Sequence, residues 1–86
     1  MSYKIIYEKS AVKFLKKQTA EQQQRIVSAI HRLPYEGDIK LMKGFQDTYR
    51  LRVGDYRVIY TVENNILTVK VLTIGNRGDV YKQSCG

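Results

Sequence analysis

Three arginines lie close together in the segment TYRLRVGDYRVIY, residues 48–60. A two-residue turn at Gly54-Asp55 would make this segment a β-hairpin, in which Arg52 faces Arg57 and Arg50 lies beside them on the same side. Like charges that face each other destabilise a sheet by up to about 1 kcal/mol, but guanidinium groups bind phosphate oxygens through paired hydrogen bonds. The spacing therefore favours a phosphate-binding surface over an exposed sheet face that is basic without a function.

A second set of basic and aromatic residues could extend this surface. Arg77 lies between two glycines in the segment IGNRGDVY, residues 74–81, and Tyr81 ends that segment. An arginine close to a tyrosine suits an RNA chain, because the arginine can hold a phosphate and the tyrosine can stack on a base or donate a proton. The lysines expected to contact RNA are Lys13, Lys16 and Lys17 on the first predicted helix, Lys43 in an irregular segment, and Lys70 on the last predicted strand.

Other reaction chemistries find little support in the sequence. The chain has one histidine, His31, and one cysteine, Cys85, and no acids lie at the spacing of metal ligands. We therefore predict no metal site and no Ser-His-Asp triad, and we interpret His31 as a structural residue. Cys85 is expected to be incidental, and its lack of an intrachain partner suits a reducing compartment.

The charge of the chain indicates the kind of partner it binds. The formal net charge is +7, from 15 Lys and Arg against 8 Asp and Glu. Such an excess makes a polyanionic partner plausible, which could be a nucleic acid, an anionic membrane or an acidic protein. The start of the sequence lacks the apolar run of a signal peptide, and no stretch is long enough to span a bilayer. We expect one cytoplasmic domain over residues 1–86.

The first half of the chain predicts a strand and two helices. Tyr3–Tyr7 is expected to be a strand, and Ser10 is expected to cap the first helix. The segment TAEQ, residues 19–22, is a capping box for the second helix, which Pro34 ends. Helices joined this closely should form an antiparallel hairpin. Residues 34–47 are expected to be irregular.

In the second half the hydrophobic period changes to two, which is typical of β-strands. Asn64-Asn65 is expected to be a two-residue turn, which would place Tyr60 opposite Val69 and Ile59 opposite Lys70. We predict an α+β fold, in which an N-terminal strand and a two-helix antiparallel hairpin accompany a mainly antiparallel, twisted β-sheet. The three strands predicted here are Thr48–Val53, Tyr56–Val62 and Ile66–Ile74.

Two longer segments, GFQDTYRLRVGDYRVIYTV and VLTIGNRGDVY, resemble the RelE/ParE superfamily of bacterial toxins, and specifically its RelE-like ribonuclease branch. The resemblance covers nearly the whole chain and implies a RelE-like fold. It also implies a type II toxin that cleaves messenger RNA in the ribosomal A site without a metal or other cofactor, by attack of a ribose 2′-OH on the adjacent phosphate. The alternatives are a ParE-like inhibitor of DNA gyrase and an RNA-binding module without catalysis.

The resemblance assigns roles to five candidate catalytic residues. Arg50 and Arg52 stand where the best-known branch has two lysines, one of them a proposed general base. Arg57 matches an arginine that stabilises the phosphate charge. Arg77 matches an arginine that aids the leaving group, and Tyr81 a tyrosine that stacks on or orients the RNA. Arg52 departs from the pattern, because a guanidinium keeps its proton and is a poor base.

Partners also follow from the resemblance. A toxin of this kind pairs with a small acidic, RelB-like antitoxin, whose helix wraps the toxin. The RNA substrate is messenger RNA in the A site of the 30S ribosomal subunit. Operator DNA would be bound only through the antitoxin complex, and no membrane is involved.

Overall fold

The structure of this chain, a computed structural model, describes residues 3–76. A strand and two helices come first, and four further strands follow. The α+β class predicted from the sequence is therefore confirmed. The elements are β1 (Lys4–Tyr7), α1 (Lys9–Lys16), α2 (Ala20–Ile30), β2 (Asp38–Leu41), β3 (Thr48–Val53), β4 (Tyr56–Glu63), the short 3-10 helix η1 (Asn64–Ile66) and β5 (Thr68–Asn76).

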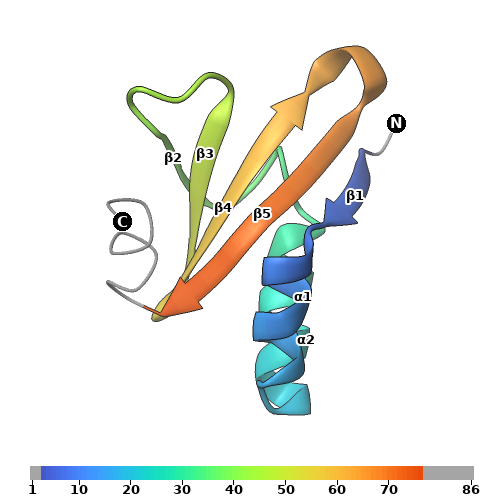
Figure 1. Cartoon of the computed structure of the whole chain (residues 1–86), viewed down its shortest axis with the longest axis vertical. Helices are drawn as coiled ribbons and strands as arrows, with labels where there is room; N and C mark the ends of the chain where they lie inside the picture. Colours follow the sequence, from blue (N-terminus) through green and yellow to red (C-terminus); the bar gives the residue numbers. More distant parts are fainter. Residues whose placement is uncertain (1–2, 77–86) are drawn as a thin grey trace.

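The five strands form one sheet in the order β1-β5-β4-β3-β2 (Figure 1). β1 runs parallel to β5, and every other pair of neighbouring strands is antiparallel. The two helices pack on one face, where α1 contacts β5 and α2 contacts β3. Because side chains alternate along a strand, residues next to the core side chains point to the other face. Within residues 3–76 no helix is long and apolar enough to cross a membrane.

The connection between the helices follows the predicted capping box in part. Thr19 is the N-cap of α2, and its Oγ1 accepts a hydrogen bond from the Gln22 backbone N–H at 3.2 Å. The Gln22 side chain does not return the bond, since its Oε1 is buried without a partner among the described residues. Instead Gln23 donates from Nε2 to the Leu15 carbonyl at 2.7 Å, and this carbonyl at the end of α1 also accepts a hydrogen bond from the Gln18 backbone N–H at 3.0 Å.

The predicted cap of the first helix is wrong. α1 begins at Lys9 after the N-cap residue Glu8, which makes no side-chain capping bond. The Ser10 hydroxyl lies inside the first turn, and its Oγ is 2.9 Å from Thr73 Oγ1 on β5. The Ser10 hydroxyl therefore links α1 to β5 instead of capping the helix. No local sequence pattern reveals such a contact between helix and sheet.

The β3–β4 hairpin has the register that the sequence predicts. Arg52 pairs with Arg57, and Arg50 pairs with Ile59. Gly54 has a φ of 57° in the two-residue turn, a conformation that glycine adopts without the steric cost of a Cβ.

The predicted β4–β5 register is wrong. The turn contains η1 and a left-handed Leu67, so the strands rejoin only at the pair of Glu63 and Thr68. Tyr60 pairs with Val71 instead of Val69. Ile59 pairs with Thr73 instead of Lys70, because a bulge interrupts the ladder between positions 59 and 60. The bulge shifts the alternation of β5, which allows Ile74 to join the core.

The segment predicted to be irregular contains a strand. β2 pairs antiparallel with β3 and places Asp38 opposite Arg52 and Lys40 opposite Arg50. Gly37 precedes the strand with a φ of 131°, and a Cβ built there would lie 2.6 Å from Leu51 Cδ1. The positive φ therefore favours glycine where the chain enters the sheet edge, and a larger residue would also require Leu51 Cδ1 to shift.

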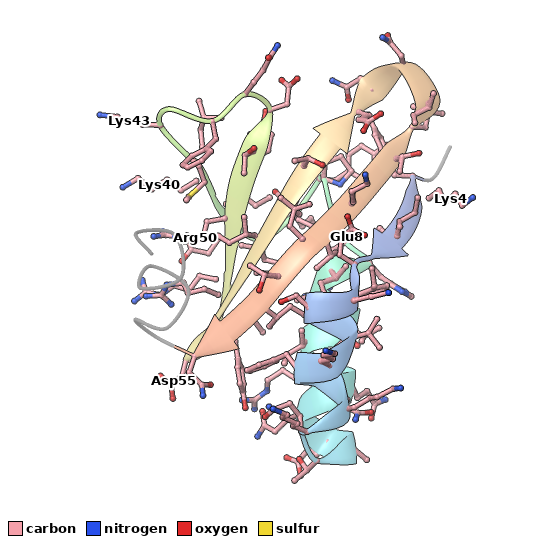
Figure 2. All side chains as sticks on the ribbon, viewed as in Figure 1. Lys4, Glu8, Lys40, Lys43, Arg50 and Asp55 are labelled. Carbon is pink, nitrogen blue, oxygen red and sulfur yellow. The ribbon has the colours of Figure 1, made fainter. Side chains whose placement is uncertain are left out.

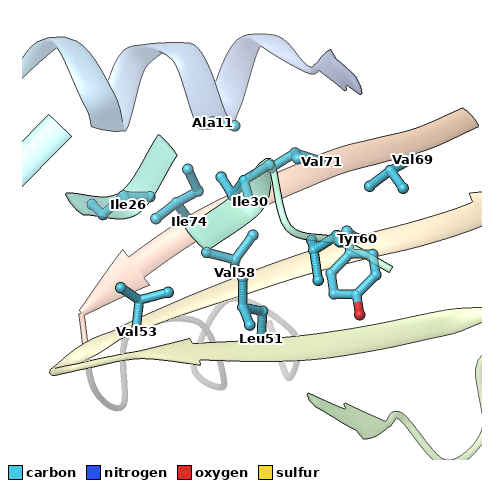
Figure 3. Close-up of a cluster of buried hydrophobic side chains, with 11 residues drawn as sticks. Ala11, Ile26, Ile30, Leu51, Val53, Val58, Tyr60, Val69, Val71 and Ile74 are labelled. Carbon is cyan, nitrogen blue, oxygen red and sulfur yellow. The ribbon is translucent and has the colours of Figure 1, made fainter. Parts of the chain in front are cut away.

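The hydrophobic core lies between the helices and the sheet (Figure 3). Tyr60 is 1% exposed and stacks on Tyr49, with ring centroids 5.6 Å apart. Its burial, with a smaller contribution from Tyr49, raises the pKa of Tyr60 to about 12. The buried hydrophobic side chains of this cluster are Ala11, Ile26, Ile30, Leu33, Leu51, Val53, Val58, Tyr60, Val69, Val71 and Ile74.

Candidate nucleic-acid interface

The three hairpin arginines lie on the sheet face opposite the helices. Their neighbours along β3 and β4, Leu51 and Val58, belong to the core, so alternation directs the arginines to the other face. Arg57 has Arg52 on one side and Gly75 on the other. Gly75 is buried and adds no side chain next to Arg57 on β5.

Arg57 is buried, and two of its guanidinium nitrogens have no hydrogen-bond partner among the described residues. Its side chain is 7% exposed, and its Nε and Nη1 atoms make no hydrogen bond to any residue between 3 and 76. A charge taken out of water without a partner is costly. Nε and Nη1 of Arg57 therefore have hydrogen-bonding capacity that no described residue uses, and a phosphate matches their planar geometry.

Two charged residues of this face were missed by the sequence reasoning. Asp38 and Lys40 lie on β2 directly opposite Arg52 and Arg50. Asp38 Oδ2 is 4.0 Å from Arg52 Nη1, and the two side chains are 59% and 47% exposed. The alternation of polar and apolar residues in DIKL is the signal that could have identified this strand.

Lys43 is brought together with the arginines. It lines a hollow at the β2 edge of the sheet, formed by Lys40, Leu41, Met42 and Arg50. Figure 2 shows the Lys40, Lys43 and Arg50 side chains on this same side of the molecule, remote from Lys4 on β1. The basic surface therefore extends beyond the arginine trio and reaches the β2–β3 loop.

The other candidate lysines lie elsewhere. Lys70 pairs with Thr61, four residues along β4 from Arg57, which corresponds to roughly 13 Å. Lys13 and Lys17 line a hollow beside Ile74, on the helix side of the sheet. Lys16 lines an apolar groove between the helices and β1. The helix lysines thus do not share a surface with the arginines.

Three of the sequence candidates lie outside the described residues, namely Arg77, Tyr81 and Cys85. His31 is exposed at the end of α2 and lines the same groove as Lys16, so it is separated from the arginines by the sheet. Between residues 3 and 76 no three acid, histidine or cysteine side chains gather as a metal site would require.

Comparison with known proteins agrees with this fold. Residues 5–81 match the family described as the ParE toxin of the type II toxin–antitoxin system, parDE. A chain of the archaeal RelE–RelB complex from Pyrococcus horikoshii OT3 is 32% identical, with a TM-score of 0.77, over 92% of this chain and 99% of that one. This chain belongs to the RelE/ParE superfamily of toxins. The resemblance noted in the sequence is confirmed.

Two further structures are similar to this RelE/ParE toxin. A chain of the RelB–RelE antitoxin–toxin complex from Methanococcus jannaschii is 28% identical, with a TM-score of 0.74, over 91% of this chain and 96% of that one. The isolated E. coli RelE toxin is 22% identical, with a TM-score of 0.73, over 98% of this chain and 96% of that one, a likeness that concerns the fold. No curated protein matches the sequence.

Proposed function

We propose that this toxin is a ribosome-dependent, metal-independent endoribonuclease that cuts messenger RNA in the A site. A ribose 2′-OH attacks the adjacent phosphate, which passes through a pentacoordinate state with added negative charge. The buried Arg57 guanidinium, whose Nε and Nη1 have no hydrogen-bond partner among the described residues, carries this proposal. Hydrogen-bond donors that are already positioned where negative charge develops in the transition state are among the strongest contributions to catalysis.

The neighbouring basic residues support an extended substrate. Arg52 and Arg50 lie next to Arg57 in the β3–β4 hairpin, and Lys40 and Lys43 continue the basic surface at its edge. A single phosphate cannot contact all of these groups at once, whereas an RNA strand offers a phosphate at every nucleotide. By resemblance, Arg77 would aid the leaving group and Tyr81 would orient the RNA.

The same proposal includes an acidic, RelB-like antitoxin in the cytoplasm. Two of the similar structures are toxin–antitoxin complexes, and the net charge of +7 suits an acidic partner. Operator DNA would be bound only through that complex. Covering the arginines with antitoxin would keep the toxin inactive.

A second candidate function is inhibition of DNA gyrase. The match to the ParE family favours it, although gyrase inhibition by itself gives no reason for a buried arginine whose Nε and Nη1 have no partner among the described residues. A third candidate is RNA binding without catalysis, which is consistent with arginine in place of a base at position 52.

One experiment separates the three functions. Purified toxin is added to a translation extract, and the 5′ ends of the messenger RNA are mapped. Codon-phased cuts that require ribosomes support the nuclease. Intact messenger RNA with trapped gyrase–DNA complexes supports the ParE-like function, and bound but uncut RNA supports the binding module.

A further inference from the structure

The arginine trio explains how a phosphate is held but leaves one step of the reaction unassigned. The 2′-OH must lose its proton as it attacks, and a guanidinium cannot accept it. A proton acceptor must therefore lie near Arg57 and Arg52. The strands predicted from the sequence, Thr48–Val53, Tyr56–Val62 and Ile66–Ile74, contain no acid, but β2 adds a fourth strand to this face.

Asp38 on β2 is placed where such a group is needed. It pairs with Arg52, which pairs with Arg57, so the three residues form one row across three strands. Neighbouring strands are about 4.8 Å apart, which sets Asp38 roughly 10 Å from Arg57 along the row. A phosphate at Arg57 and Arg52 would bring its attached ribose toward Asp38.

The contact between Asp38 and Arg52 leaves the carboxylate available. Asp38 Oδ2 and Arg52 Nη1 are 4.0 Å apart, which exceeds the length of a charge-assisted hydrogen bond. The Asp38 side chain is 59% exposed, so a ribose hydroxyl can reach it from solvent. Arg52 nevertheless balances the charge of Asp38, which limits the repulsion between this carboxylate and the RNA phosphates.

No other described acid shares this row. Asp55 lies in the β3–β4 turn beyond Arg52 and Arg57 (Figure 2), and Glu63 lies at the far end of β4. Glu8 and Glu21 stand at the starts of the two helices, on the other side of the sheet. Of the carboxylates within residues 3–76, Asp38 is the one whose partner in the sheet pairing is an arginine.

We propose that Asp38 is the general base of this toxin, an inference that rests on the nuclease function proposed above. The Asp38 carboxylate accepts the proton of the 2′-OH while the 2′-oxygen forms a bond to phosphorus. The bond between phosphorus and the 5′-oxygen breaks, and the departing 5′-oxygen takes a proton from water. The products are a 2′,3′-cyclic phosphate and a 5′-hydroxyl end.

The test is single-turnover cutting of a short synthetic messenger RNA on programmed ribosomes by the full chain. Asp38→Asn should slow the cutting step roughly 100- to 10,000-fold, the usual contribution of a general base, with ribosome binding unchanged. Asp38→Glu should recover part of the rate, because it restores a carboxylate. Glu21→Gln is the matched control and should cut like the wild type.

A double-mutant cycle distinguishes the base from a residue that merely positions Arg52. If Asp38 takes the proton, Asp38→Asn slows cutting further in an Arg52→Ala background. If Asp38 acts only through Arg52, the double variant cuts no more slowly than Arg52→Ala alone, and the inference is wrong. It is also wrong if Asp38→Asn cuts at the wild-type rate. A wild-type protein that cuts no ribosome-bound RNA would overturn the proposed function itself, and this inference with it.

Discussion

At position 57 the chain buries a charged side chain, although an apolar side chain would cost less free energy to bury. Arg57 is 7% exposed, and its Nε and Nη1 have no hydrogen-bond partner among the described residues. Replacing a buried charge with an apolar side chain of similar volume is often neutral or stabilising. The free protein therefore gains little stability from this charge, which is the pattern expected of a group that binds an anion.

Arg57 variants test that interpretation. Arg57→Met keeps an unbranched apolar stem and Arg57→Ala removes it, and both should reduce the cutting rate about 100-fold or more, as expected for loss of a group that stabilises transition-state charge. The melting temperature of Arg57→Met should not fall, because Nε and Nη1 make no hydrogen bond to a described residue. Arg25→Ala, on the exposed side of α2, serves as the control. Wild-type cutting by Arg57→Met would remove Arg57 from the site.

Tyr60 makes stability depend on alkaline pH. Burial raises its pKa to about 12, above the unfolded value of about 10. The folded state therefore holds the phenol proton more tightly, so this contribution is complete below about pH 10 and is lost as the pH rises toward 12. Two pKa units correspond to at most about 3 kcal/mol.

Tyr60→Phe should lose less stability than the wild type between about pH 9 and pH 11.5. Urea unfolding at several pH values measures the difference. Lysines and the other tyrosines titrate in both proteins, so the comparison isolates position 60. Parallel curves for the two proteins would mean that the phenol of Tyr60 ionises as readily in the folded state as in the unfolded chain.

At the scale of elements, β2 is the strand that completes the candidate site. It is four residues long and lies at the edge of the sheet, yet it supplies Asp38 and Lys40 to the arginine face. Its entry depends on Gly37, whose φ of 131° and close approach to Leu51 Cδ1 disfavour a side chain. A change at Gly37 should therefore affect both the stability of the fold and the position of Asp38.

Gly37→Ala should lower the free energy of unfolding by about 1–3 kcal/mol, because it combines backbone strain with overpacking against a core side chain. Gly44→Ala is the matched control: Gly44 also has a positive φ, of 85°, but a Cβ there would meet no atom within 4 Å. Denaturant unfolding of the two variants separates strain from contact. Equal losses would show that the approach to Leu51 has no energetic importance.

At the scale of the whole molecule, the positive charge is divided between two sides. The arginines, Lys40 and Lys43 lie on one side, whereas the α1 lysines lie with the helices. Charges that do not contact the substrate still raise the rate of encounter with a polyanion, and at 0.1 M salt this attraction is largely screened beyond about 10 Å. The two groups should therefore act on different steps.

Replacing Lys13, Lys16 and Lys17 together by Gln should slow association with ribosomes several-fold at low salt, with the effect shrinking as the salt concentration rises. The cutting rate at saturating ribosomes should stay unchanged. Stopped-flow binding and single-turnover cutting measure the two steps separately. A lower saturating rate would place the helix lysines in contact with the RNA during the reaction.

The sequence by itself determined the features that arise from local interactions. The Thr19 cap depends on residues three positions apart, and the register of Arg52 against Arg57 depends on a two-residue turn with glycine at its first position. The change in the spacing of hydrophobic residues, from a helical period to a strand period, likewise depends on residues close together in the sequence. Each of these predictions rests on contacts within a few residues, so these features do not depend on how the rest of the chain folds.

Only the tertiary structure decided the features that depend on distant contacts. The pairing of β2 with β3 places Asp38 beside Arg52, and the bulge in β4–β5 shifts the register that a simple turn would impose. The burial of Arg57 likewise arises from the assembled sheet. A strand pairing is stabilised by hydrogen bonds to a neighbour far along the sequence, so a pattern within one segment cannot reveal which charges will meet.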